Sequence, residues 1–259
     1  MDWVAAVILA SAAVPLGWAW WANRRTSLAH ALSWAALAYM TWGAAAMAYV
    51  VWGAAALTGE RLVLGYLALC LTNCAGVAVL GARRPGVVAW NFVVAGLLIV
   101  QLLPLAEGFG ALHLTWPPLL FLAGTLAVCV LNYLPTRLGP AALLVGLFCG
   151  TELWSLMAPP GPPIRWGWLT LPVPPWLALV LIKARAAPAS EIDRTWLRFR
   201  DSFGALWAER TREQFNRAAA NAGLAGRLGW RGLRGAPAAE HGQLLDILRA
   251  VLKRFGPAD

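Results

Sequence analysis

The strongest chemical signal in this chain is a single acidic residue, Glu152, inside a long apolar run. The run Pro140–Pro160 reads PAALLVGLFCGTELWSLMAPP and is long enough to cross a bilayer. An ionisable side chain in hydrocarbon is costly, and it usually faces a neighbouring helix, a cavity or a conduction pathway. Gly146 and Gly150 in the same run have the GxxxG spacing that allows another helix to approach closely. The run therefore predicts a spanning helix that packs on one face and presents a carboxylate on another.

Four further polar residues are expected near Glu152 or at the membrane surface beside it: Gln101, Asn73, Arg61 and His113. Two interpretations are open. In the first, these groups form an outward-facing site for a proton, a cation or a polar ligand. In the second, which we favour, Glu152 is a packing carboxylate that its polar neighbours satisfy, because hydrogen bonds between membrane helices commonly serve packing.

Other kinds of chemistry find no support in the motifs. The chain has no HExxH, no GxSxG, no P-loop and no complete GxGxxG pattern. The cysteines lie in apolar runs without the CxxC spacing of zinc or redox sites: Cys70, Cys74, Cys129 and Cys149. The histidines are expected at places where no two meet across one haem: His30, His113 and His241. We therefore predict no catalytic residue, no metal site and no cofactor.

Composition indicates the class of protein that must position these groups. Of 259 residues, 60% are hydrophobic and 13% are charged, whereas soluble domains carry about a quarter charged residues. The apolar residues fall in long blocks, which is the pattern of transmembrane helices. Seven blocks are expected to span the membrane: Trp3–Ala22, Ala31–Leu57, Leu62–Ala82, Val87–Leu105, Leu119–Leu134, Ala141–Ala158 and Trp166–Ile182. Prolines interrupt the last block, so it is expected to be short or kinked.

The positive charges orient these spans. With seven spans, most basic residues of the loops fall on one side: Arg24, Arg25, Arg83, Arg84, Arg137, Lys183 and Arg185. Only Arg61 and Arg165 fall on the other side, which is the asymmetry that marks a cytoplasmic face. Six spans would leave the basic C-terminal tail outside. The sequence therefore predicts an all-α, polytopic helix bundle in a bacterial cytoplasmic (inner) membrane, with its N-terminus outside and its C-terminus inside.

The chain is expected to divide into a membrane bundle, residues 1–186, and a cytoplasmic tail, residues 187–259. The tail is predicted to hold two amphipathic helices, at about 190–222 and 240–255, joined by a flexible Gly/Arg-rich loop. Ser190 is a suitable N-cap of the first helix, since acidic residues follow in the first turn. One face of this helix carries aromatic residues that we predict to be docking residues: Trp196, Phe199, Phe203 and Trp207. The two helices could pack as a hairpin, or the first could dock on the membrane or the bundle, which we favour.

The charge of the tail indicates its partners. From Lys183 onward there are 14 Lys and Arg residues against 8 Asp and Glu residues, a net charge of +6. A basic segment beside the lipid bilayer is expected to meet anionic lipid or a membrane-protein partner rather than nucleic acid. These features favour a protein that acts by binding, as an accessory, assembly or anchoring subunit, and not an enzyme. The alternative is a small transporter or sensor with an outward-facing polar site around Glu152.

Overall fold

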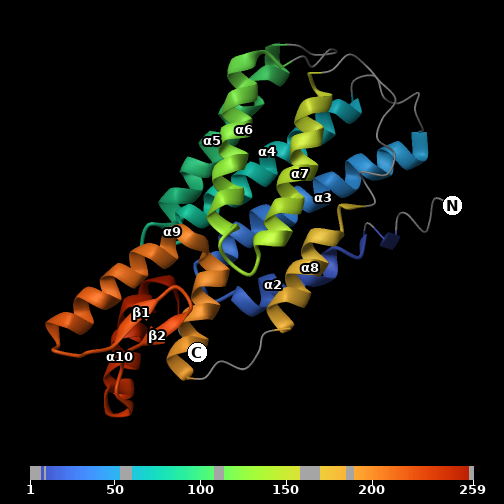
Figure 1. The fold of residues 1–259 in the computed structure, drawn as a ribbon. Helices are drawn as coiled ribbons and strands as arrows, with labels where there is room; N and C mark the ends of the chain where they lie inside the picture. The colour runs from blue at the N-terminus through green and yellow to red at the C-terminus, as the bar shows by residue number, and fades with distance from the viewer. Residues whose placement is uncertain are drawn as a thin grey trace.

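The computed structural model describes residues 7–8, 10–52, 60–107, 114–157, 170–184 and 190–256, without the side chains of residues 49–52, 60–62 and 107. These residues are almost entirely helical, so the all-α class expected from the sequence is correct. The apolar part of the described chain forms seven helices: α2 (Ala13–Asn23), α3 (Leu28–Trp52), α4 (Glu60–Leu80), α5 (Val87–Glu107), α6 (Trp116–Tyr133), α7 (Gly139–Ser155) and α8 (Val173–Lys183). Each helix overlaps one of the seven apolar blocks (Figure 1).

Proline residues begin several of these helices. α6, α7 and α8 each carry proline at the first positions, where the missing N–H has no intrahelical partner to lose. α8 begins at Val173, with Pro174 and Pro175 in its first turn, and continues to Lys183. The prolines of the last apolar block therefore start a short helix of 11 residues.

Three helices contain segments long and apolar enough to cross a membrane: Val63–Leu80 in α4, Val87–Ala106 in α5 and Trp116–Tyr133 in α6. Together they fit an integral membrane protein. Among the other helices of the apolar part, α2, α7 and α8 are shorter, with 11, 17 and 11 residues. In α3, the side chains of residues 49–52 are not among those described.

The bundle helices are arranged around a common interior, and their contacts give the order of neighbours. The Tyr66 hydroxyl of α4 donates to the Gln101 carbonyl of α5 at 2.5 Å, and further along the Cys74 thiol lies 3.7 Å from the Val94 carbonyl. These contacts show that α4 and α5 run antiparallel. Six helices contact one another in a closed ring, in the order α3, α4, α6, α7, α8 and α2, while α5 packs outside the ring against α4.

Side chains fill the middle and the far end of this ring, away from the C-terminal residues. Trp42 of α3 is buried, donates from Nε1 to the Thr72 hydroxyl at 3.0 Å, and meets the edge of Phe148 at 4.8 Å between ring centroids. Leucines from three helices pack into the same core: Leu69 of α4, Leu122 of α6 and Leu153 of α7. Packed side chains therefore fill this part of the ring among the described residues.

The C-terminal residues form a domain on the opposite end of the bundle (Figure 1). Its elements are α9 (Glu191–Asn221), β1 (Arg227–Gly229), β2 (Gly232–Arg234), the 3-10 turn η3 (Ala238–Glu240), α10 (His241–Leu252) and the 3-10 turn η4 (Lys253–Phe255). The Ser190 hydroxyl accepts the Asp193 N–H at 3.1 Å, so α9 begins with the N-cap that its sequence predicts.

The Gly/Arg-rich segment is a β-hairpin, so the expectation of a flexible loop is wrong. β1 and β2 pair antiparallel, and Gly232 has a φ of +139°, which residues with a side chain rarely adopt. α9 holds the hairpin in place: the Asn216 amide exchanges two hydrogen bonds with the Leu228 backbone, at 2.7 and 3.1 Å. The Asp193 carboxylate accepts the Leu233 N–H at 2.7 Å. These partners are distant in sequence, and the glycine spacing alone does not reveal them.

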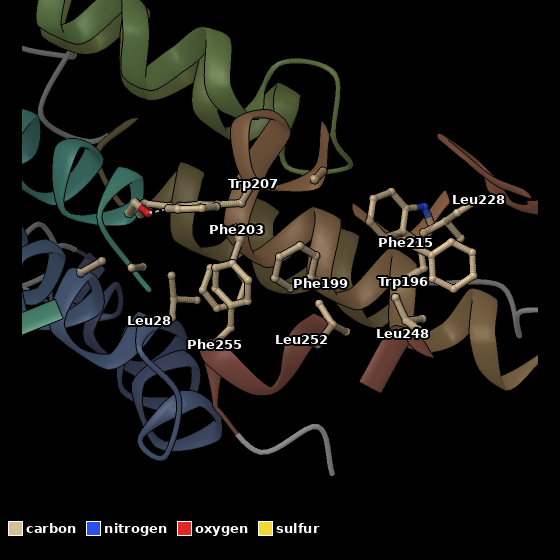
Figure 2. Packing of buried hydrophobic residues seen from close by; sticks show 14 of the residues in the cluster. Leu28, Trp196, Phe199, Phe203, Trp207, Phe215, Leu228, Leu248, Leu252 and Phe255 are labelled. Atoms are coloured by element: carbon tan, nitrogen blue, oxygen red, sulfur yellow. Dashed lines mark hydrogen bonds between the residues drawn. The ribbon is translucent and has the colours of Figure 1, made fainter. Parts of the chain in front are cut away.

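A second hydrophobic core joins this domain to the bundle (Figure 2). Phe255 makes edge contacts with Phe199, Phe203 and Trp207, at 4.8, 5.0 and 5.2 Å between ring centroids. Bundle residues complete the core: Leu28 and Ala31 of α3, Ala78 and Val79 of α4, Ala82 beyond α4, and Val94 of α5. Burying a large apolar side chain contributes roughly 1.5–3 kcal/mol, so this shared core holds the domain firmly on the bundle.

Candidate functional site

α9 is interrupted at Gly204, where the bundle contributes a side chain. Gly204 has a φ of +79° and a ψ of −177°, so a second helical segment starts after it. The first N–H groups of a helical segment lack intrahelical partners. Asn132, near the end of α6, supplies one partner, because its Oδ1 accepts the Leu206 N–H at 3.0 Å. Asn132 therefore caps the second half of α9 from another helix, a role usually filled by the residue just before the segment.

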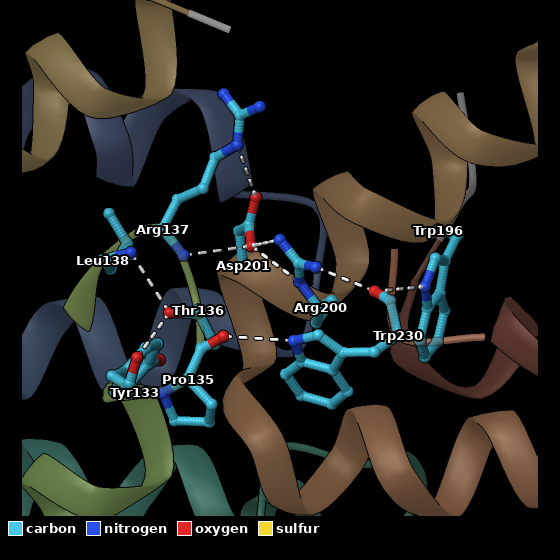
Figure 3. A network of polar contacts seen from close by, with 9 residues as sticks. All are labelled: Tyr133, Pro135, Thr136, Arg137, Leu138, Trp196, Arg200, Asp201 and Trp230. Carbon is cyan, nitrogen blue, oxygen red and sulfur yellow. Dashed lines mark hydrogen bonds and ion pairs between the residues drawn. The ribbon is translucent and has the colours of Figure 1, made fainter. Parts of the chain in front are cut away.

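A buried ion pair lies beside this interruption (Figure 3). Asp201 Oδ1 accepts from Arg200 Nη2 at 2.7 Å and from Nε at 3.0 Å, and both side chains are less than a tenth exposed. The Arg137 backbone N–H lies 3.4 Å from the same oxygen. Arg200 also donates to the Trp230 carbonyl at 2.8 Å, and the Trp230 indole donates to the Pro135 carbonyl at 3.1 Å. The network ties α9 and the hairpin turn to the turn between α6 and α7.

The other turns at this end of the bundle also bind the domain. The Trp207 indole donates to the Val79 carbonyl at 3.0 Å, and the Tyr133 hydroxyl donates to the Ser202 carbonyl at 2.9 Å. Two backbone hydrogen bonds hold η4: Ser27 N–H to the Phe255 carbonyl at 3.0 Å, and Arg84 N–H to the Arg254 carbonyl at 2.8 Å. Directional hydrogen bonds therefore fix the domain at the α2–α3, α4–α5 and α6–α7 ends.

The aromatic residues of the stripe predicted to dock are all buried: Trp196, Phe199, Phe203 and Trp207. Figure 2 shows Phe203 and Trp207 on the side of α9 that faces the bundle, next to Phe255, whereas Trp196 lies within the C-terminal domain beside Phe215 and Leu248. Packing of α9 on α10 and docking on the bundle, which the sequence presented as alternatives, occur together. Because the chain itself encloses these rings, they are not exposed as a docking surface.

A second buried stripe follows the interruption and was not expected: Ala208, Thr211, Phe215 and Ala219. A continuous helix would have placed Arg210 on the buried face after Trp207, and Arg210 is exposed. The non-helical backbone at Gly204 rotates the following segment, so a new apolar face begins at Ala208. The spacing of three, four and four residues from Ala208 was the signal that could have revealed it.

α7 meets its neighbours on two faces. Glu152 is half-buried, and its carboxylate faces α4, where a Cβ added to Gly65 would lie 4.0 Å from Oε2. Gly146 lies against α6, since a Cβ there would lie 2.7 Å from Val130 Cγ2. A Cβ on Gly150 would meet nothing within 4 Å. Of the GxxxG pair, only Gly146 marks a close helix contact.

The other members of the predicted polar site are only partly described. Gln101 and Asn73 are buried on α5 and α4, and Asn73 Nδ2 donates to the Leu122 carbonyl at 3.3 Å. Both side-chain amide atoms of Gln101 are buried without a hydrogen-bond partner among the described residues. The side chain of Arg61 and the residue His113 lie outside the described part of the chain. The outward-facing site around Glu152 therefore stays a prediction.

A cavity of about 310 Å³ lies inside the ring of six helices. Small residues in the walls leave the space open: Ala31, Ala35, Ala75, Gly76 and Ala142. The cavity occupies the half of the ring nearest the C-terminal domain, since Ser202 of α9 is among its lining residues. Glu152, Gln101 and Asn73 do not line it. The polar site predicted around Glu152 and this cavity therefore lie in different parts of the bundle.

The fold and these sites define a class: an integral membrane protein built as a helical bundle, with a C-terminal domain docked on one end. Across the described ranges, no group of three or more His, Cys, Asp or Glu side chains could hold a metal ion. No protein-family model, no curated protein and no solved structure matches the chain. Its function is therefore inferred from its own surfaces and cavity.

Proposed function

We propose that the chain crosses a bacterial cytoplasmic membrane seven times, with its N-terminus outside and its C-terminal domain in the cytoplasm. The charge distribution supports this topology. Basic residues lie at the helix ends and turns nearest the C-terminal domain: Arg24, Arg25, Arg83, Arg84, Arg137 and Lys183. The α2–α3 and α4–α5 turns meet there, since Arg84 Nη2 donates to the Arg25 carbonyl at 3.0 Å. Cytoplasmic ends of membrane helices carry this excess of Lys and Arg.

A pair of reporters fused after Asp259 tests the topology. Alkaline phosphatase folds to an active enzyme only when exported, whereas green fluorescent protein becomes fluorescent in the cytoplasm. We expect the phosphatase fusion to be inactive and the fluorescent fusion to be bright. As a control, phosphatase inserted in the segment 108–113, which seven spans put outside, is expected to be active. An active phosphatase after Asp259 would contradict the proposed topology.

We further propose that the protein acts by binding, as an accessory, assembly or anchoring subunit. One observation carries this proposal: buried, directional contacts hold the C-terminal domain on the bundle, including the Asn132 cap of α9 and the Arg200–Asp201 pair. A domain held in this way presents its exposed surface at a fixed position and orientation relative to the bundle. A subunit that positions a partner needs this fixed geometry, and a domain on a free tether would not provide it.

The exposed surface of the domain indicates the chemistry of its partner. Several arginines are exposed: Arg198, Arg210, Arg217, Arg227, Arg231 and Arg234. On the hairpin, Arg227 lies directly opposite Arg234 in the strand register. Like charges directly opposite each other destabilise a strand pair, so this arrangement favours contact with an anionic group over the stability of the hairpin itself. The partner we propose is an acidic surface of another membrane protein.

Charge reversal on the hairpin tests this role in the full-length protein. Wild type purified gently from native membranes is expected to carry one polypeptide in near-stoichiometric amount, measured by quantitative mass spectrometry. Arg227→Glu with Arg234→Glu is expected to lower that amount at least about tenfold, because two attractive contacts become repulsive. Lys253→Glu, a charge reversal at an exposed residue of η4, is the control and is expected to keep the partner.

Two outcomes would contradict the role as a subunit. One is equal recovery of the polypeptide with wild type and with the hairpin variant. The other is loss of anionic lipid from the hairpin variant with no stoichiometric polypeptide in wild type, which would make a membrane surface the partner.

A further inference from the structure

The cavity in the ring ends within the bundle at one end and reaches the C-terminal domain at the other. Tyr39 of α3 and Val145 of α7 line it. One helical turn further along, Trp42 and Phe148, which are not among the lining residues, meet at 4.8 Å between ring centroids. At the other end, Ser202 of α9 lines it. A ligand in this space would therefore lie along the bundle axis, with one end near the basic turns.

The walls favour an apolar ligand. Most of the lining is aliphatic, from α2, α3, α4, α6, α7 and α8. Of the polar side chains in the wall, Asn23, Thr72 and Tyr133 donate to backbone carbonyls at 2.8–2.9 Å. Tyr39 and Ser202, which also carry hydroxyl groups, line the cavity as well, so a few polar residues lie in a mostly aliphatic wall. A volume of about 310 Å³ is at the lower end of the range of ligand pockets. The space suits one hydrocarbon chain rather than a large ring system.

Two basic residues directly follow cavity-lining residues in the chain, at the ends of α2 and α8, which we call the rim of the cavity. Asn23 and Ile182 line the cavity, and the next residues along the chain are Arg24 and Lys183, both exposed. Lys183 Nζ lies 5.7 Å from the ring centroid of Trp18, which also lines the cavity. Neither cation forms an ion pair with an acidic residue in the described part of the chain. The rim is therefore positive where the apolar interior begins.

The nearest buried acid of the C-terminal domain does not cancel this charge. Asp201 is held by Arg200 at 2.7 Å, and Arg137 Nε lies 4.0 Å from its other oxygen. Arg24 Cζ stacks 3.8 Å from the ring centroid of Trp21, and Arg24 Nη1 donates to the Trp21 carbonyl at 2.9 Å, so the guanidinium is held beside the last turn of α2. An apolar cavity with a positive rim matches a molecule that has a hydrocarbon chain and an anionic head.

We propose that the cavity holds one acyl chain of an anionic phospholipid, with the phosphate held at the rim by Lys183 and Arg24. The helices that form the cavity belong to the apolar part of the chain, which fits an integral membrane protein. In a membrane, phospholipid is the most abundant molecule with both a hydrocarbon chain and an anionic group. The inference is independent of the partner proposed for the hairpin, because the hairpin arginines do not line the cavity.

The head-group contact is tested by reconstituting the full chain in nanodiscs of equal phosphatidylglycerol and phosphatidylcholine. The lipid retained on release is then counted by native mass spectrometry. Wild type is expected to retain one phosphatidylglycerol in preference to phosphatidylcholine. Lys183→Gln and Arg24→Gln are each expected to lower this preference about fivefold, since one basic residue near anionic lipid contributes about 1 kcal/mol. Arg83→Gln, a basic residue of the α4–α5 turn that does not adjoin a cavity-lining residue in the chain, is the matched control and is expected to change nothing.

The chain contact is tested by filling the cavity. Ala35→Phe and Ala142→Phe are expected to abolish retention of the single lipid of either kind, because the ring would occupy its space. Leu37→Phe, on an exposed position of α3, is the matched control. Thermal unfolding and the protease resistance of the C-terminal domain check that each variant is folded. If a phenylalanine variant does not fold, Ala142→Leu, which adds a smaller side chain, is used in its place.

Three results would overturn the proposal. The first is equal retention of the two lipids by wild type, and the second is retention by a folded, filled variant at the wild-type level. The third is the same loss of preference in Arg83→Gln as in Lys183→Gln, since that would make the effect one of general surface charge.

Discussion

Gly204→Ala is expected to release the C-terminal domain from the bundle. The backbone at this position has a φ of +79° and a ψ of −177°, a region that is essentially restricted to glycine, and a side-chain-bearing residue there is strained by about 1–3 kcal/mol. A Cβ at this position would also overlap the amide of Asn132, the group that caps the second half of α9. Both effects raise the free energy of the docked state, so the fraction of undocked molecules increases.

The measurement is the rate of limited trypsin cleavage within α9 and the hairpin, with the protein in detergent micelles. Cleavage follows the population of the open state, and each 1.4 kcal/mol raises that population tenfold, so we expect at least about a tenfold rise. Gly223→Ala is the control: its φ is +71°, but a Cβ there would meet nothing within 4 Å. If Gly204→Ala is cleaved by trypsin no faster than wild type, the cap at Asn132 does not hold the domain.

Asp201→Asn is expected to have a comparable or larger effect at the same interface. Arg200 and Asp201 are both less than a tenth exposed, and their closest atoms are 2.7 Å apart. Removing one charge of a buried pair leaves the other uncompensated, which typically costs about 3–5 kcal/mol. The same change weakens the acceptor for the Arg137 N–H in the α6–α7 turn. Trypsin cleavage in α9 is therefore expected to rise by about a hundredfold or more.

An exposed pair of the same length is the control for this variant. Glu191 and Arg249 also approach to 2.7 Å, but their side chains are 57% and 48% exposed, and such pairs contribute about 0–1 kcal/mol. Glu191→Gln is expected to leave cleavage nearly unchanged. Combining Arg200→Met with Asp201→Leu removes both charges, and we expect it to restore much of the protection. Equal cleavage in Asp201→Asn and Glu191→Gln would refute a role for the buried pair.

Local patterns were sufficient to predict the helical class and the extents of most helices. Long apolar blocks become helices because a helix satisfies its backbone groups within one segment, and this needs no partner. α5, predicted from Val87, begins at Val87, and α9 begins after the cap at Ser190. The aromatic face of α9 was also visible, because apolar residues at helical spacing must be covered by something. What covers them was not visible in that spacing.

Only the tertiary structure decided the interruption at Gly204, the hairpin, the docking contacts and the cavity. Each depends on groups distant in the sequence, such as Asn132 with Leu206 or Trp207 with Val79. A glycine in a helical run carries no sign of the side chain that will approach it, and a run of glycines and arginines does not show that Asn216 and Asp193 will order it. The cavity has the same origin, because its walls come from six helices whose small residues become neighbours only when the ring closes.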